Sequence, residues 1–295
     1  EYFKDQTIER YVDKVFPLAK LKEIYMTNDP LDPQEWPVWN KGFNRDQRFK
    51  AVLRLDSALM NWPQGAKILK ARGYKVQGTL CQKTYSGIRK YLNEWCDRMS
   101  SCYMAISLPP TFRYPDKKSA LTNLFTKTVL ATARERKIPV AMMIGVKKLV
   151  NPNLRLAGDS VGRSEIETLE NLACDFSDVK FLVTMLSREN MHELCVTARK
   201  FKNIIIFGCW WFLNNPSLIR EITAMRLELL GLTFVPQHSD ARVLDQLIYK
   251  WGHSREIISR VLSEKYLDMA KAGGIINEEI VRRDVNILFD GRLVS

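Results

Sequence analysis

Charged and aromatic residues follow short apolar runs at several points in this sequence of 295 residues. In chain order they are Asp29, Asp32, Arg54, Asp56, Lys147, Lys148, Trp210, Trp211, His238, Asp240 and Arg242. Carboxylates can take up and release protons, and arginine or lysine can bind an anion. These residue types could therefore carry out chemistry on a small acidic molecule, provided that the fold brings them together.

The apolar runs are rich in Val, Ile, Phe and Met, as expected of buried strands. They cover residues 23–27, 49–54, 102–107, 139–145, 180–185, 203–212 and 232–236. Longer segments with apolar residues at helical spacing lie between them, and this alternation is typical of a parallel α/β sheet. No Gly-rich phosphate loop follows any run, which favours a TIM-type (β/α)8 barrel with one strand missing over the alternative, an open doubly wound sheet.

Several helices can be placed more closely. We expect helices at 119–137, at 187–200 with Ser187 as a candidate N-cap, and at 216–230 with Pro216 at the first position and Gly231 beyond the end. Further helices are predicted at 243–271 and 277–289. No linker or low-complexity tract divides the chain, so residues 1–295 should form a single, partial barrel domain with C-terminal helices.

In such a barrel the carboxyl ends of the strands build the active site, so the polar residues should gather at one mouth.

The longest apolar stretches are about half the length of a membrane-spanning helix. The net charge is +12, but the basic residues are distributed among acidic ones, which favours a solvated basic face over a nucleic-acid groove. Six cysteines without a Cys-x-x-Cys pair indicate reduced thiols and a cytoplasmic protein. The sequence begins at Glu1 without a Met, so we expect the biological start to lie upstream.

Two segments late in the chain carry a family resemblance. Gly208-Cys-Trp-Trp-Phe212 and Ser239-Asp-Ala-Arg242 resemble the Gly-x-Trp-Trp-Phe and Thr-Asp-Ser-Arg segments of bacterial uronate isomerases, which belong to the amidohydrolase superfamily. Earlier segments resemble other motifs of the family in the same order, namely Thr27-Asn-Asp-Pro-Leu-Asp32, Arg54-Leu-Asp56, Ile144-Gly-Val-Lys-Lys148 and Gly158-Asp-Ser-Val-Gly162. The seven runs would then be the family's strands two to eight, with the first strand absent from this chain.

The resemblance implies an intramolecular oxidoreductase, an aldose–ketose isomerase that converts a hexuronate through an enediol, as in glucuronate to fructuronate. Such a site needs a base at the C2 hydrogen, stabilisation of the enediolate oxygen, and a cation for the carboxylate. The residues implied as catalytic are Asp240, which is also a possible metal ligand, and Asp159. The residues implied as substrate-binding are Arg54, Arg242, Trp210 and Lys148.

Each candidate also has a structural interpretation. Asp240 and Arg242 could form an ordinary ion pair. Trp210 and Trp211 should point to opposite faces of a strand, so that only one reaches the barrel interior or mouth. The others could be a hydrogen-bonded structural histidine (His238), caps of the helix after the first strand (Asp29 and Asp32), and solvated lysines (Lys147 and Lys148).

The sequence departs from the family at the metal site. It has no His-x-His pair, Met143 stands where the family has a histidine, and two of the three histidines, His192 and His253, fall in predicted helices. A divalent metal such as zinc is therefore expected only in the complete protein. The alternatives are a divergent or inactive barrel that binds sugar acids, or another reaction of the superfamily. The expected partner is a small sugar acid, with no nucleic acid and no membrane, and homo-oligomerisation stays open.

Overall fold

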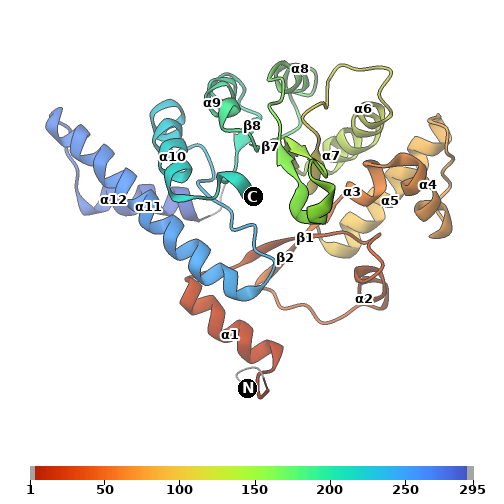
Figure 1. Cartoon of the computed structure of the whole chain (residues 1–295), viewed down its shortest axis with the longest axis horizontal. Helices are drawn as coiled ribbons and strands as arrows, with labels where there is room; N and C mark the ends of the chain where they lie inside the picture. The colour runs from red at the N-terminus through yellow and green to blue at the C-terminus, as the bar shows by residue number, and fades with distance from the viewer. Residues whose placement is uncertain (1–3, 291–295) are drawn as a thin grey trace. The chain divides into compact units, whose positions relative to one another are not determined.

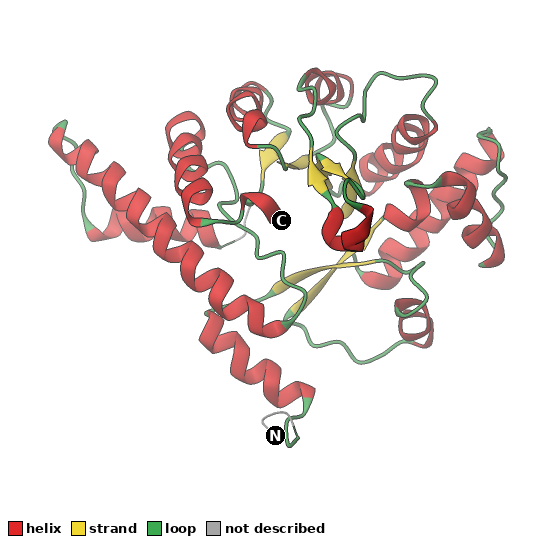
Figure 2. Ribbon diagram, in the orientation of Figure 1, coloured by secondary structure: helices red, strands yellow, loops and turns green. Residues whose placement is uncertain are grey.

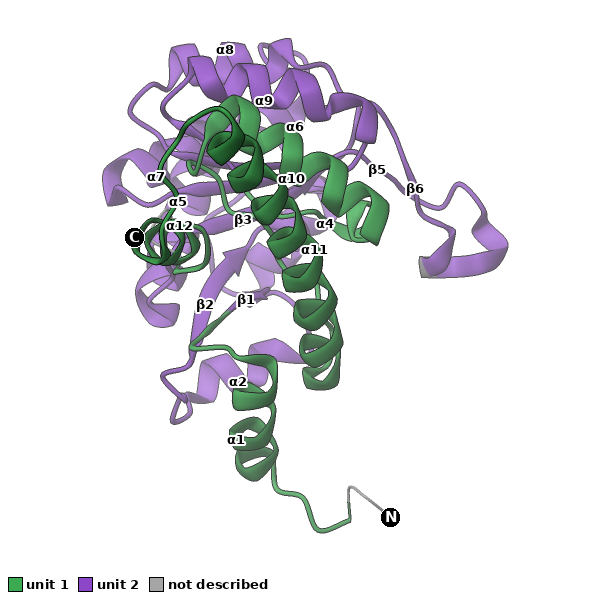
Figure 3. Cartoon of the chain, turned by 90° about the vertical axis from the view of Figure 1, so that its left-hand side faces the viewer, with its two compact units in different colours: residues 1–24, 207–293 green, residues 25–206, 294–295 purple. Residues whose placement is uncertain are grey.

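The computed structural model describes residues 4–290. The chain divides into two compact units, shown in different colours in Figure 3. Residues 25–206 form the first, which we call the sheet unit, and residues 4–24 and 207–290 lie in the second, the helical unit. That the chain acts as a single domain stays a prediction.

The sheet unit is built on a six-stranded sheet with neighbouring strands in chain order (Figures 1 and 2). The strands are β1 (Ile24–Asn28), β2 (Phe49–Arg54), β3 (Met104–Leu108), β4 (Val140–Ile144), β7 (Phe181–Met185) and β8 (Ile204–Ile206). Pairing is parallel from β2 to β8. Every residue of β4 and β7 is buried, as expected of parallel strands covered by helices on both faces. The predicted α/β fold of the TIM-barrel type is confirmed.

Helices follow the strands of this unit. They are α2 (Glu35–Lys41), α3 (Asp56–Leu59), α4 (Trp62–Ala71), α5 (Gln82–Met99), α6 (Ala120–Leu124), α7 (Ala131–Arg136), α8 (Glu167–Asp175) and α9 (Met191–Lys200). A π-helical stretch, Phe125–Leu130, joins α6 to α7, so the helix predicted at 119–137 is continuous. A short antiparallel pair, β5 (Val146–Lys147) and β6 (Ser160–Val161), encloses a 3-10 helix at Pro152–Gly158.

The helical unit contains α1 (Ile8–Ala19), α10 (Pro216–Leu230), α11 (Leu244–Lys271) and α12 (Glu278–Phe289). Helix α11 packs against both α1 and α10. The expected ends of α10 are confirmed, since Pro216 lies in the first turn and Gly231 follows the last residue with φ of 62°. The long segment 243–271 is one helix.

The two last predicted strands are shorter than expected. The run 203–212 forms a strand only at β8, and a 3-10 helix begins at Trp211. The run 232–236 contributes a single parallel bridge, between Val235 and Phe207. Gly208, with φ of 69°, turns the chain out of the extended conformation, and Pro236 has no N–H to continue the ladder.

Ser187 does not cap the helix that follows it. Its side chain makes no capping hydrogen bond and donates instead to the Glu189 carboxylate. A 3-10 turn, Arg188–Asn190, precedes α9, so the side chain that a sequence pattern assigns to capping is used within the turn.

Candidate active site

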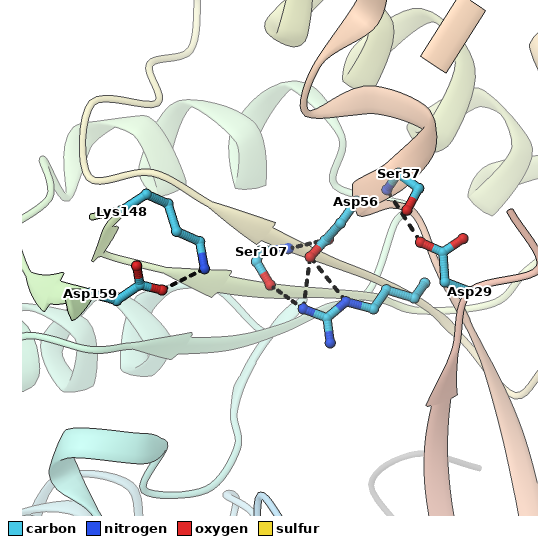
Figure 4. Close-up of polar contacts among 7 residues, drawn as sticks. Asp29, Asp56, Ser57, Ser107, Lys148 and Asp159 are labelled. Carbon is cyan, nitrogen blue, oxygen red and sulfur yellow. Dashed lines mark hydrogen bonds and ion pairs between the residues drawn. The ribbon is translucent and has the colours of Figure 1, made fainter. Parts of the chain in front are cut away.

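Arg54 and Asp56 lie where β2 leaves the sheet, and Ser107 lies near the same end of β3 (Figure 4). Arg54 donates from Nε and Nη2 to Asp56 Oδ2 at 3.0 and 2.7 Å, and from Nη2 to Ser107 Oγ at 3.0 Å. The backbone N–H of Ser107 donates to Asp56 Oδ1 at 2.9 Å. A guanidinium held in this way can bind an anion through its remaining N–H groups.

Asp29 and Asp32 both accept backbone hydrogen bonds. Asp29 is buried and accepts from the N–H groups of Leu31 at 3.0 Å and Ser57 at 3.3 Å, so it caps the start of α3. Burial raises the pKa of the Asp29 carboxyl. Asp32 accepts from the backbone of Gln34 and Glu35 and caps α2. The capping interpretation therefore holds for Asp32, whereas Asp29 caps a different helix from the expected one.

Lys148 and Asp159 form an ion pair across the loop between β5 and β6 (Figure 4). Lys148 Nζ lies 2.7 Å from Asp159 Oδ2, and the backbone N–H of Leu149 donates to Asp159 Oδ1 at 2.9 Å. The Lys148 side chain is 69% exposed and that of Asp159 only 3%. The hydrogen bond from Lys148 lowers the pKa of Asp159, which stays ionised at neutral pH. Lys148 is thus paired and not simply solvated, whereas Lys147 is exposed.

Asp240 and Arg242 lie in the helical unit, in the loop before α11. Both are exposed, and their hydrogen bonds are made by the backbone. The Asp240 carbonyl accepts from Lys250 Nζ at 2.7 Å, and the Arg242 N–H donates to Gln246 Oε1 at 2.8 Å. Within residues 4–290 neither side chain has an ion-pair partner, so the structural alternative of a mutual ion pair does not hold and both charges stay available to a ligand.

Trp210 and Trp211 do not alternate across a strand as predicted, because the strand has already ended at Ile206. Trp210 is buried, and Trp211 opens a 3-10 helix in which its ring stacks on Phe212 with centroids 4.6 Å apart. The Trp210 and Trp211 rings are tilted by 54° at 6.1 Å. Trp210 as a wall for the sugar stays a prediction.

The His238 ring packs against an aromatic neighbour. It lies 5.2 Å from the ring of Phe207, and its buried Nε2 has no hydrogen-bond partner among the described residues. The structural interpretation that relied on a hydrogen bond is therefore wrong. Burial lowers the pKa of His238 to about 4 against the opposing effect of Asp240, so the ring is neutral at neutral pH.

Gln237, which the sequence did not single out, organises this loop. Its buried Oε1 accepts from the N–H groups of Cys209 at 2.7 Å and His238 at 3.0 Å. Its Nε2 donates to Asn214 and Ser254 at 3.1 and 3.2 Å. One amide thus fixes the segments around Cys209 and His238. The only signal in the sequence was a polar residue next to the predicted last strand.

Within residues 4–290 no three His, Cys, Asp or Glu side chains come together as metal ligands, and the expected metal site includes histidines that this chain does not contain. Asp240 could supply one oxygen, but the residues around it do not complete a site. Zinc therefore stays a prediction. In the same part of the chain, no helix has the length and apolar character needed to cross a membrane.

The candidates thus fall into local groups. The sheet unit joins Arg54 to Asp56 and Ser107 in one group and Lys148 to Asp159 in another. In the helical unit, Trp210 comes after the end of β8 along the chain, and Asp240 and Arg242 come after the bridge residue Val235. That all of them gather at one mouth stays a prediction.

Comparison with known proteins found no matching family model and no matching curated protein. Among solved structures, a uronate isomerase from Bacillus halodurans is 49% identical, with a TM-score of 0.96, and the match covers 99% of this chain and 69% of that one. A uronate isomerase from Thermotoga maritima is 16% identical with a TM-score of 0.76, covering 96% of this chain and 69% of that one. A glucuronate isomerase from Caulobacter crescentus is 12% identical with a TM-score of 0.71, covering 95% and 65%.

The two distant structures share the fold with this chain. The Bacillus halodurans enzyme is similar in sequence as well, at 49% identity over nearly the whole chain. The predicted resemblance, which used motifs from Thr27 to Arg242, is confirmed by this match. The chain belongs to the uronate isomerase family.

Proposed function

We propose that the protein interconverts a hexuronate aldose and its ketose, as in glucuronate to fructuronate, through an enediol. The observation that carries this proposal is the 49% identity to a uronate isomerase, of which this chain spans 69%. The reaction moves a proton from C2 to C1 and shifts the carbonyl from C1 to C2, so it has no external oxidant or reductant.

The substrate carboxylate needs a cation that is fixed in place, because a fixed guanidinium loses little freedom when it binds. Arg54 meets this need, since Nε and Nη2 of its guanidinium are already held by Asp56 and Ser107. Arg242 is a second candidate, because its guanidinium is exposed and has no ion-pair partner among the described residues. We assign the carboxylate to Arg54 and a hydroxyl or the enediolate oxygen to Arg242.

Proton transfer needs a carboxylate that no cation neutralises. Asp240 fits, because its side chain is exposed and has no ion-pair partner within residues 4–290. We assign it the transfer between C2 and C1. Asp159 is already bound to Lys148, so we assign the two as a pair that binds one sugar hydroxyl, with Trp210 packing against the sugar ring.

We also propose that the protein works in the cytoplasm and that its partner is a free sugar acid. The cysteine pattern supports this location, because six cysteines without a Cys-x-x-Cys pair are typical of proteins kept in a reducing compartment.

The test is to incubate the intact protein with glucuronate in deuterium oxide and to follow the sugar by NMR. Transfer through an enediol should give fructuronate that carries solvent deuterium at C1, at least in part. Glucose, which lacks the carboxylate, should not be converted. If neither glucuronate nor its C4 epimer galacturonate is converted, the proposed function is wrong.

A further inference from the structure

We propose that Asp56 is a positioning residue, which fixes the Arg54 guanidinium so that one free nitrogen faces the uronate carboxylate. This inference rests on the proposed function and names the side chain that prepares its carboxylate site. The family resemblance implied no role for Asp56 or for Ser107.

The first observation is which N–H groups of Arg54 are used. Nε and Nη2 donate to Asp56 Oδ2 at 3.0 and 2.7 Å, and Nη2 also donates to Ser107 Oγ at 3.0 Å. Three of the five guanidinium N–H groups, those of Nε and Nη2, are therefore satisfied by protein. Both N–H groups of Nη1 have no acceptor among the described residues, and the side chain is 37% exposed. A ligand carboxylate can reach only that nitrogen without breaking a bond.

The second observation is that Asp56 is itself anchored. Its Oδ1 accepts the Ser107 N–H at 2.9 Å, and its side chain is only 23% exposed. Arg54 pairs with Ala105 in the sheet, so Ser107 is two residues further along β3, on the same face. The carboxylate therefore connects the end of β2 to the next strand, and Arg54 takes its orientation from both.

Two other roles for Asp56 would change the effect of its removal. A carboxylate beside Arg54 also neutralises part of its charge, so its removal could strengthen anion binding. If Asp56 only stabilised the turn into α3, its removal would lower the thermal stability and would act independently of Arg54. These alternatives make different predictions for the same substitution.

The test is Asp56→Asn in the intact protein, with the kinetics of glucuronate isomerisation as the readout. Asparagine keeps an oxygen for the Ser107 N–H but turns an NH2 group toward the guanidinium, which frees Arg54 to move. We expect KM to rise about tenfold, as for the loss of one charge-assisted hydrogen bond, while kcat changes little. Ser107→Ala, which removes one of the three bonds, should raise KM less.

Asp46→Asn is the matched control. Asp46 and Arg48 form an ion pair with the same spacing of two residues, with Nε donating to both carboxylate oxygens at 3.0 Å, just before β2 begins. It lies at the amino end of the strand, away from the carboxyl ends that build the site in such folds. Asp46→Asn should leave the glucuronate kinetics unchanged.

A double-mutant cycle separates positioning from a structural role. In an Arg54→Ala background, Asp56→Asn should cause no further rise in KM, because Asp56 has no arginine left to orient. An added rise equal to that in the wild type, or a KM that stays the same or falls in the single variant, would overturn the proposal.

Failure of the proposed function would look different, because the wild type itself would convert no hexuronate. Asp56 can then still be tested by following the Arg54 Nε–H by NMR, with Arg54→Lys to assign its signal. The proposal expects this proton to exchange with solvent more slowly in the wild type than in Asp56→Asn. Equal exchange rates would exclude the positioning role.

Discussion

Asp240 combines an unpaired charge with an unusual backbone. Its φ is 47°, in the left-handed region, where aspartate and asparagine are tolerated better than most residues. Its carboxylate is exposed and has no ion-pair partner within residues 4–290, so it contributes little to the stability of the fold. A conformation of this kind, combined with an available carboxylate, is common where a side chain must face a ligand.

We therefore predict that Asp240→Asn abolishes turnover of glucuronate and leaves the thermal midpoint unchanged. Asparagine keeps the shape and tolerates the same φ but cannot accept the C2 proton. Asp268→Asn, an exposed position on α11, is the control and should keep full activity. Turnover by Asp240→Asn within a few-fold of the wild type would exclude Asp240 as the base.

Asp159 should make stability depend on pH. Its folded pKa lies below the ordinary value of 3.8 because Lys148 and the Leu149 N–H bind the ionised form. The stabilisation is therefore fully present above the ordinary value and is lost as the pH falls through the lower folded pKa. Since Lys148 is exposed, we expect it to be at most about 1 kcal/mol.

Urea unfolding of the wild type and Asp159→Asn can check this prediction. At neutral pH the variant should be slightly less stable, and the difference should shrink in acid below the ordinary aspartate value. The same difference at both pH values would mean that the ionised form of Asp159 is not preferentially stabilised in the folded protein.

At the scale of elements, the first five predicted runs form strands close to their predicted bounds, whether mostly exposed as in β1 or buried as in β4. The runs containing Val140 and Phe181 are mostly apolar, and both form strands that are buried along their whole length. The run around Trp210 is equally apolar but ends as a strand at Ile206, because Gly208 redirects the chain. An apolar run thus predicts burial better than extended structure.

The candidate site shows a similar limit. Arg54 and Asp240 could be chosen from the sequence because charged residues follow apolar runs and match family motifs. The contact of Arg54 with Ser107 depends on the register of β2 and β3, which the residues of either strand alone do not specify. Gln237 was missed because its hydrogen bonds to Cys209, Asn214 and Ser254 connect segments distant in sequence.

Gly208 allows a close approach that any other residue would prevent. A Cβ atom there would lie 1.8 Å from Cδ2 of His238, and φ is 69°. Gly208→Ala should therefore destabilise the protein by more than the roughly 1 to 3 kcal/mol of backbone strain, because the histidine ring must also move. Gly231→Ala is the matched control, since its φ is 62° and a Cβ would meet no atom within 4 Å. Thermal unfolding should show a clearly larger loss for Gly208→Ala, and equal losses would mean that the ring moves away freely.

At the scale of the whole molecule, the net charge of +12 has two competing explanations. Several arginines are already paired with acids on the surface, as in Arg134–Asp178, Arg163–Glu193 and Arg220–Glu264. A paired guanidinium contributes little to attracting a polyanion. Arg54 differs, because two of its N–H groups stay free beside the carboxylate that orients it, and Arg242 has no carboxylate partner among the described residues.

These explanations predict different responses to salt. If the charge serves an acidic sugar, Arg54→Ala should weaken glucuronate binding by about tenfold or more, as for a lost charge-assisted hydrogen bond of about 1.5 to 3 kcal/mol. Glucose should bind poorly to the wild type and be little affected, because it lacks the carboxylate. If the charge serves nucleic acid, oligonucleotide affinity should be high, fall steeply with salt and depend on the scattered surface lysines more than on Arg54. Calorimetry of the intact wild type, Arg54→Ala and Arg242→Ala at two salt concentrations would separate the two explanations. Tight, salt-sensitive oligonucleotide binding without uronate binding would overturn the assignment of the charge to a sugar acid.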